Sequence, residues 1–206
     1  MNMRKNFFNY FNNFPYFTKQ SLIVLADKFN IGKNSLNTYI QRAIKKKEVI
    51  PLKQGVYVTW KFFNKNKNKT SYAFYLSNVL MSSSYVTRES ALQYYGLLSE
   101  AVLNIVTANT LKTPRKFKNC LGFFEYRNIK NDLFRGFIEK EENNFKFLIA
   151  EPHKAIFDYL YYRAEFSKLN SGNLEDILDE LRIDHEDLSN IEKGKLIKLI
   201  KESKNG

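Results

Sequence analysis

Cysteine and glycine are both scarce in this sequence. The single cysteine, Cys120, cannot form an internal disulfide, which fits a reducing compartment. We interpret Cys120 as a packing residue rather than a nucleophile, because no catalytic motif surrounds it. The eight glycines stand singly, so neither a G-x-G-x-x-G nor a P-loop phosphate-binding motif can be written.

Long apolar runs are lacking as well. No stretch of 18 apolar residues exists, so we expect no bilayer-spanning helix. The N-terminal segment "MNMRKNFFNYFNNF" alternates Asn with aromatic residues and is too polar for the apolar core of a signal peptide. We therefore predict a cytoplasmic protein.

Residues that hold metal ions are few. The two histidines, His153 and His185, lie 32 residues apart, and with one cysteine they form no clustered ligand set. We predict no metal and no cofactor, and we interpret His153 as a surface or interface histidine.

The acidic residues do not suggest catalysis either. A basic chain could be a DNA-cleaving enzyme, but its usual Asp/Glu-x-Lys pattern occurs only as Glu202-Ser-Lys204 at the C-terminus. Glu139, Glu141 and Glu142 flank a predicted hairpin turn, where a solvated charge cluster is the simpler interpretation. We predict no catalytic residues and no enzymatic activity.

Negative charge is almost missing from the first third of the chain. Residues 1–70 contain 14 Lys and Arg but only Asp27 and Glu48 as acids, whereas residues 71–206 contain 19 residues of each sign. The whole net charge of +12 therefore belongs to residues 1–70. Such asymmetry predicts a nucleic acid or an anionic membrane as partner. We do not expect a membrane partner, because the apolar stripes of this segment are needed for a core.

The basic segment has the element order of a winged helix-turn-helix. We predict a helix capped by Thr18, a break at Gly32, and a second helix from about Asn34. Strands 49–52 and 56–60 follow, with a turn at Gly55. The apolar stripe of the second helix comprises Leu36, Ile40, Ala43 and Ile44.

In that fold the second helix enters the major groove and the hairpin meets the phosphate backbone. Asn, Thr, Gln and Arg side chains on this helix are of the types that can discriminate bases, while lysine side chains contact phosphates. The predicted DNA-binding residues are Lys33, Asn34, Ser35, Asn37, Thr38, Gln41, Arg42, Lys45, Lys46, Lys53 and Gln54. The alternative is a protein-docking module with a solvated basic face. We do not favour it, because residues 1–70 have too few carboxylates to pair these cations.

The rest of the chain predicts an α+β domain with a mixed sheet and flanking helices. We divide the chain into a winged helix-turn-helix domain (1–63), a linker "NKNKNKT" (64–70) and a second, α+β domain (71–206). The predicted helices are 71–81, 87–96 (capped by Thr87 and closed by Gly96), 151–166 (with Pro152 first), 173–182 and 188–203. The predicted strands are 84–86, 101–108, 120–129, 133–141 and 145–150.

Four segments between about Thr18 and Tyr162 carry a family resemblance through their order and spacing. They are "LKQGVYV", "YVTRESALQYYGL", "LFRGF" and "FLIAEPHKAIFDYLYY". Together they resemble the AbiEi antitoxin family, the antitoxin half of abortive-infection (type IV) toxin–antitoxin modules used in phage defence. The resemblance implies a winged-helix domain that binds inverted repeats in its own promoter, and a C-terminal domain that counteracts a nucleotidyltransferase toxin.

The resemblance also singles out positions in the C-terminal domain. The antitoxin-domain candidates are Thr87, Arg88, His153, Lys154 and Asp158. His153 departs from the family, which more often has Glu there. Read without the family, Asp158 pairs with a neighbouring cation, and Ser90, Ala91, Leu92 and Gly96 are packing and capping residues.

We therefore predict a cytoplasmic DNA-binding antitoxin and transcriptional autorepressor that has no enzymatic activity. Its partners would be a double-stranded inverted-repeat operator and a nucleotidyltransferase toxin; whether the two proteins form a stable complex is left open. A monomer in solution that binds DNA cooperatively is compatible with this prediction. The alternative is a winged-helix transcription factor with a ligand- or partner-sensing C-terminal domain and no toxin.

Overall fold

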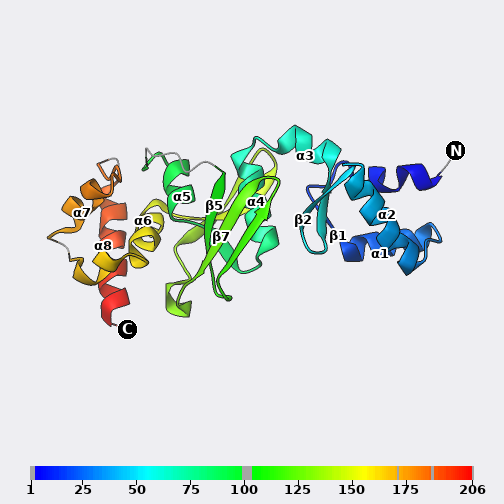
Figure 1. The fold of residues 1–206 in the computed structure, drawn as a ribbon. Coiled ribbons are helices and arrows are strands. Elements are labelled where there is room, and N and C mark those ends of the chain that lie inside the picture. Colours follow the sequence, from blue (N-terminus) through cyan, green and yellow to red (C-terminus); the bar gives the residue numbers. More distant parts are fainter. Residues whose placement is uncertain (1–2, 99–103, 171, 187, 206) are drawn as a thin grey trace. The chain divides into compact units, whose positions relative to one another are not determined.

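The computed structural model describes residues 3–98, 104–170, 172–186 and 188–205. The chain forms two compact units, residues 1–69 with 118–121, and residues 70–117 with 122–206. We call them the N-terminal and the C-terminal unit and describe each by itself (Figure 1). None of the described helices is long and apolar enough to cross a membrane.

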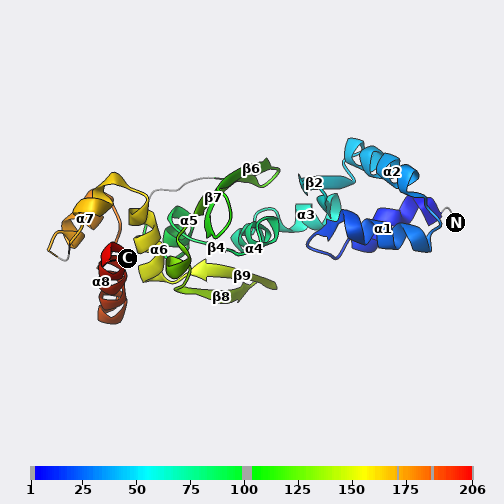
Figure 2. The ribbon, with the colours of Figure 1, turned by 90° about the horizontal axis from the view of Figure 1, so that it is seen from below.

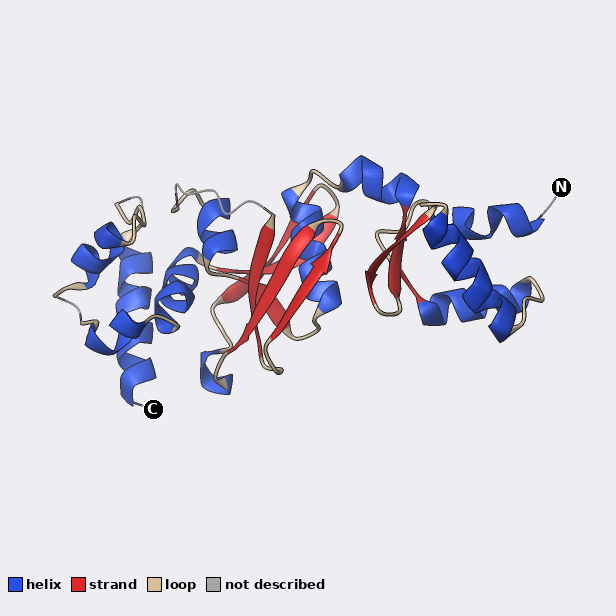
Figure 3. Cartoon of the chain, viewed as in Figure 1, coloured by secondary structure: helices blue, strands red, loops and turns tan. Residues whose placement is uncertain are grey.

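The N-terminal unit combines helices with one small sheet (Figure 3). Its elements are the 3-10 helix η1 (Met3–Phe11), β1 (Phe17–Thr18), α1 (Lys19–Lys28), α2 (Lys33–Lys45), β2 (Val49–Lys53), β3 (Val56–Thr59) and α3 (Trp60–Asn66). The strands form an antiparallel sheet in the order β1-β3-β2.

Local sequence signals set the two central helices. The Thr18 side chain accepts a hydrogen bond from the Ser21 backbone at 3.1 Å, and the Ser21 hydroxyl accepts one from the Thr18 backbone at 3.3 Å. This reciprocal capping box starts α1, which confirms the predicted cap. Gly32 precedes α2, whose residues Leu36, Ile40 and Ala43 are buried as the stripe predicts.

Aromatic packing completes the core of the N-terminal unit. The rings of Phe11 and Phe17 stack with centroids 4.3 Å apart, and Phe17 stacks on Tyr57 at 5.8 Å. The N-terminal aromatic segment therefore forms η1 and β1, two elements that the sequence did not predict. Trp60 begins α3 instead of ending a strand. Gly55 has φ +77° in the β2–β3 turn, as predicted.

The C-terminal unit is an α+β structure built on a mixed sheet with flanking helices. Its elements are α4 (Thr70–Leu80), β4 (Ser84–Val86), α5 (Glu89–Tyr94), β5 (Ile105–Thr110), β6 (Arg115–Asn119), β7 (Gly122–Asn128), η2 (Asn131–Leu133), β8 (Phe137–Glu142), β9 (Phe145–Ala150), α6 (Pro152–Tyr161), η3 (Ala164–Lys168), α7 (Leu174–Glu180) and α8 (Asn190–Asn205). The sheet order is β6-β7-β5-β4-β9-β8, with parallel pairs β4·β9 and β5·β7. Helix α4 packs against β9, β4 and β5, and α6 packs against α5 and α8 (Figure 2).

Several predicted boundaries in this unit need correction. Helix α5 starts at Glu89, and its N-cap is Arg88 rather than Thr87, whereas Gly96 follows the helix with φ +73° as predicted. The predicted strand 101–108 is β5, which runs to Thr110; residues 101–103 lie outside the described residues. The predicted strand 133–141 starts later than expected, because Leu133 is the last residue of η2 and strand β8 begins at Phe137. Strand β6 was not predicted.

Two glycines give a matched test of the fold. Gly122 has φ +121°, and a Cβ there would lie 2.2 Å from the backbone oxygen of Asn104. Gly122→Ala should therefore lower the free energy of unfolding by about 2 kcal/mol or more, because the strand must shift. Gly194 in α8 has open space at its Cβ position, so Gly194→Ala should raise it by about 1 kcal/mol. Urea unfolding followed by circular dichroism measures both, and equal effects of the two substitutions would contradict the β7 geometry.

Candidate functional site

Helix α2 presents a polar face to solvent. Leu36, Ile40 and Ala43 point into the core, and the side chains between them are exposed. The exposed predicted residues are Lys33, Asn34, Ser35, Asn37, Thr38, Gln41, Arg42, Lys45, Lys46 and, in the β2–β3 turn, Gln54, while Lys53 is half-buried. The structure thus brings the predicted DNA-binding residues of α2 onto one accessible surface, which we call the α2 face.

The cations of the α2 face are not neutralised within the described part of the chain. Lys33, Arg42, Lys45 and Lys46 make no ion pair with any described carboxylate. The nearest acids in sequence, Asp27 and Glu48, are themselves exposed. The face therefore has an uncompensated positive potential, which attracts polyanions at a range set by ionic strength.

The C-terminal unit has a buried ion pair at its centre. Lys154 and Asp158 have side chains that are 0% exposed, and the Lys154 Nζ donates to Asp158 Oδ1 at 2.6 Å. The other carboxylate oxygen, Oδ2, accepts from the Tyr85 and Thr87 hydroxyls, each at 2.8 Å. Burial lowers the pKa of Lys154, and the charge of Asp158 opposes that shift. Asp158 pairs with a neighbouring cation, as the sequence indicated. Its hydrogen-bond partners Lys154, Tyr85 and Thr87 all belong to the C-terminal unit.

This arrangement explains why Thr87 does not cap α5. Its hydroxyl donates to Asp158, 71 residues further along the chain. The first turn of α5 is held instead by Thr107 of β5, whose hydroxyl accepts from the Ser90 backbone at 3.1 Å. The Thr107 backbone donates to the Ser90 hydroxyl at 2.8 Å in return, so the two residues fasten α5 to the sheet.

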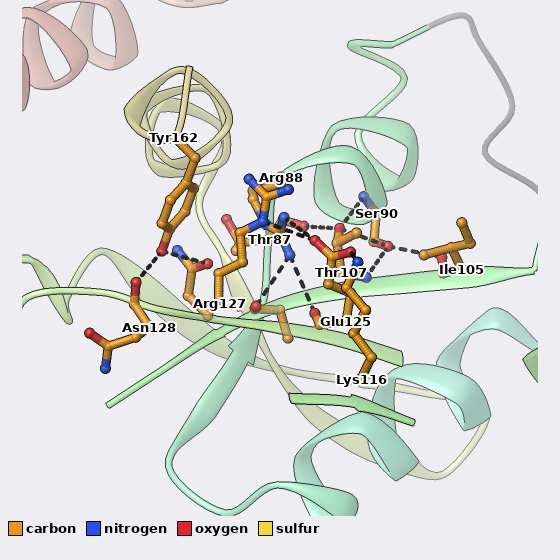
Figure 4. Close-up of polar contacts among 12 residues, drawn as sticks. Thr87, Arg88, Ser90, Ile105, Thr107, Lys116, Glu125, Arg127, Asn128 and Tyr162 are labelled. Carbon is orange, nitrogen blue, oxygen red and sulfur yellow. Dashed lines mark hydrogen bonds and ion pairs between the residues drawn. The ribbon is translucent and has the colours of Figure 1, made fainter. Parts of the chain in front are cut away.

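Arg88 forms a second polar cluster with Glu125 (Figure 4). Its backbone has φ +56°, a left-handed conformation that is unusual for arginine. The side chain is 2% exposed, and its Nη1 lies 3.1 Å from Glu125 Oε1. Arg127 and Lys116 lie 2.9 Å from Glu125 Oε1 and Oε2, so three cations share one carboxylate.

The three cations dominate the titration of Glu125. Partial burial by itself would raise the pKa of this carboxyl. Hydrogen bonds from Lys116 and Arg88, with the charges of Arg88 and Arg127, outweigh burial and lower the pKa to about 2. Glu125 is therefore a carboxylate that holds cations in place and has no use as a proton donor near neutral pH.

His153 is buried, which corrects its interpretation as a surface residue. Its side chain is 6% exposed, and its Nδ1 and backbone N–H both contact Glu192 Oε2 in α8. Ligand atoms of Glu151, His153 and Glu192 lie within 4.8 Å of one another, a spacing that a metal ion can use. The Lys195 Nζ lies 3.3 Å from both glutamates and supplies a positive charge there. The cluster thus joins the start of α6 to α8, and the ammonium group of Lys195 is its cation.

Two other sequence interpretations can be checked. Cys120 is exposed in the β6–β7 turn, so it is not a packing residue. Lys146 lies 3.3 Å from Glu139 and 3.9 Å from Glu141, and all three side chains are more than half exposed. This confirms the solvated charge cluster beside the β8–β9 turn.

Comparison with protein-family models and with curated proteins finds no match to this chain.

The buried pair gives a stability prediction. Asp158→Ala should lower the free energy of unfolding by about 3–5 kcal/mol, because it leaves the Lys154 ammonium buried without a partner. Replacing both residues, Lys154→Met with Asp158→Leu, should cost less than Asp158→Ala alone. Urea unfolding of the two variants measures the difference, and a double variant that loses more than the single one would contradict this account.

Glu125 gives a prediction about acid stability. Because its folded pKa lies below its ordinary value of 4.5, its contribution is present above about pH 4.5 and is lost as pH falls towards about 2. Glu125→Gln should flatten the loss of unfolding free energy across that range. Urea titrations of wild type and Glu125→Gln at several acidic pH values measure this. If the unfolding free energies of both proteins fall in parallel with pH, the ion pairs of Glu125 do not contribute to stability.

Proposed function

We propose that the chain is a DNA-binding antitoxin and transcriptional autorepressor, with its N-terminal unit acting as a winged helix-turn-helix. The observation that carries the proposal is the α2 face, where one exposed surface holds cations without an ion pair to any described carboxylate and polar side chains of the types that can read bases. A polyanion offers the negative charge that such a face attracts. A duplex offers phosphates at regular spacing together with base edges for the polar side chains.

The element order of the N-terminal unit supports this proposal. Helices α1 and α2 are separated by a short turn ending at Gly32, and the β2–β3 hairpin follows directly. Helix α2 has 13 residues and so a length of about 20 Å, enough to lie across a major groove. Lys53 and Gln54 precede the Gly55 turn, where a wing would meet the adjoining phosphates.

The antitoxin part of the proposal is supported by the four ordered segments that resemble the AbiEi family. Within the C-terminal unit, the candidates Thr87, Arg88, His153, Lys154 and Asp158 are all buried. We therefore propose that they maintain the shape of the domain, and that any contact with a nucleotidyltransferase toxin is made by other side chains. Loss of antitoxin activity on substituting these five would then follow loss of folding.

Arg42 and Lys46 give a matched test of DNA recognition. Arg42→Ala should weaken binding to a duplex from the chain's own promoter by about 1–3 kcal/mol and reduce the preference over random DNA. Lys46→Ala should weaken both duplexes alike and reduce the slope of log affinity against log salt by about 1. Fluorescence anisotropy over a range of salt measures both quantities.

Lys146→Ala is the control, since Lys146 is an exposed lysine of the C-terminal unit that already pairs with Glu139 and Glu141. It should leave both affinities nearly unchanged. Equal losses on both duplexes for Arg42→Ala and Lys46→Ala would contradict the assignment of α2 to the groove.

The antitoxin role is tested in cells through the neighbouring gene. If that gene encodes a nucleotidyltransferase that arrests growth, co-expression of this chain should restore growth, and Arg42→Ala should still restore it. A neighbouring gene of another kind would instead favour a winged-helix transcription factor with a sensing C-terminal domain.

A further inference from the structure

We propose that a basic groove on β6 and β7 of the C-terminal unit binds the phosphate groups of a small phosphorylated molecule, such as a diphosphate or a nucleoside phosphate. The groove has a volume of about 320 Å³ and is lined by Pro114, Arg115, Lys116, Glu125, Tyr126 and Arg127. Its residues belong to the C-terminal unit and those of the α2 face to the N-terminal unit, and the proposal does not depend on DNA binding.

The groove has more positive charge than it can neutralise. Arg115, Lys116 and Arg127 line it, and Arg88 approaches Glu125, the only carboxylate among the lining residues. Both oxygens of Glu125 are already engaged, Oε1 by Arg88 and Arg127 and Oε2 by Lys116. Positive charge therefore remains for an added anion.

Donor groups remain for that anion as well. Arg127 uses its Nε for Glu125, and its two Nη groups make no hydrogen bond within the described residues. The Lys116 side chain is 78% exposed and has further N–H groups beyond its bond to Glu125. Arg115 is exposed and makes no ion pair with a described carboxylate. A guanidinium fork with two free nitrogens suits two oxygens of one phosphate.

The Arg127 fork is held in place before any ligand arrives (Figure 4). Its Nε is fixed 2.9 Å from Glu125, and its guanidinium lies over the Tyr162 ring at 5.2 Å. Tyr162 is itself fixed, because its hydroxyl donates to the Asn128 backbone oxygen at 2.8 Å. Binding an anion therefore costs little side-chain entropy at Arg127.

Arg88 positions Glu125 for this arrangement. Its left-handed backbone and buried side chain cost conformational energy, and its Nε has no hydrogen-bond partner among the residues that the structure describes. In return Arg88 Nη1 binds Glu125 Oε1, and Nη2 reaches the backbone oxygens of Ala108 and Glu125 at 3.4 and 3.3 Å. Strain of this kind is concentrated at binding sites, which makes Arg88 a positioning residue for the groove.

The dimensions favour a small ligand over a macromolecule. The volume lies within the range of about 300–1,000 Å³ that is usual for small-molecule sites. Three cations on the neighbouring strands β6 and β7, Arg115, Lys116 and Arg127, match two or three negative charges carried on few atoms. A diphosphate has that charge density, whereas an acidic peptide places at most one carboxylate on each residue.

The test is isothermal titration of the full chain with inorganic pyrophosphate and with ATP, both without divalent cations. Wild-type protein should bind both probes. Arg127→Ala and Lys116→Ala should weaken binding by about tenfold or more, and Arg127→Lys should retain only part of the affinity, because it keeps the charge and loses the fork.

Lys146→Ala is the matched control, an exposed lysine of the same sheet outside the groove, and it should bind like wild type. Circular dichroism melting of each variant separates lost binding from lost folding. Absence of pyrophosphate and ATP binding by wild type, or unchanged binding by folded Arg127→Ala, would overturn the proposal.

Measuring duplex affinity of the same variants distinguishes the role of the groove from that of the α2 face. Arg127→Ala and Lys116→Ala should leave duplex affinity unchanged, whereas Arg42→Ala should lower it. If duplex affinity falls with Arg127→Ala while pyrophosphate does not bind, the groove is a nucleic-acid contact and the small-ligand proposal is wrong. Failure of Arg42→Ala to affect DNA would count only against the proposed function.

Discussion

Fourteen lysine and arginine side chains share the first 70 residues with two carboxylates, and no folding of that segment can pair them internally. The small N-terminal core is built from apolar residues of α1, α2 and the sheet, such as Leu22, Leu36 and Val58, and the cations of α2 lie outside it. On α2 the apolar stripe fixes which face is buried, and therefore which side chains remain outside. The same pattern that folds the helix thus creates the surface that we propose for DNA.

The C-terminal unit differs from the N-terminal unit in that many of its charged side chains form ion pairs. Several of its cations are paired within the domain, Lys154 with Asp158 and Lys195 with Glu151 and Glu192. Lys154 and Asp158 are fully buried, so this pair holds one geometry and is closed to solvent. The groove on β6 and β7 is the exception, because there three cations meet one carboxylate and donor groups are left over.

The sequence predicted those parts of the structure that depend on neighbouring residues. Thr18 and Ser21 lie three positions apart, the stripe from Leu36 to Ala43 spans two turns, and Gly55 and Gly96 occupy left-handed positions in short turns. Each of these signals is local, and each was confirmed.

Features set by distant residues were not predictable in this way. Thr87 looked like a helix cap, but Asp158 takes its hydroxyl. His153 looked exposed, but Glu192, 39 residues later, covers it. The cluster of Arg88 with Glu125 left no trace in the sequence, since the two side chains meet only when β7 pairs with β5. The β6 segment "RKFKN" was missed because its charged residues do not resemble a strand interior.

The most direct test of the central claim is chemical modification of lysine amines, read by mass spectrometry, with and without a duplex from the chain's own promoter. If DNA covers the α2 face, Lys33, Lys45 and Lys46 should lose reactivity, while Lys146 and Lys198 of the C-terminal unit should react as before. Unchanged reactivity of Lys33, Lys45 and Lys46 in a fully formed complex would contradict the account.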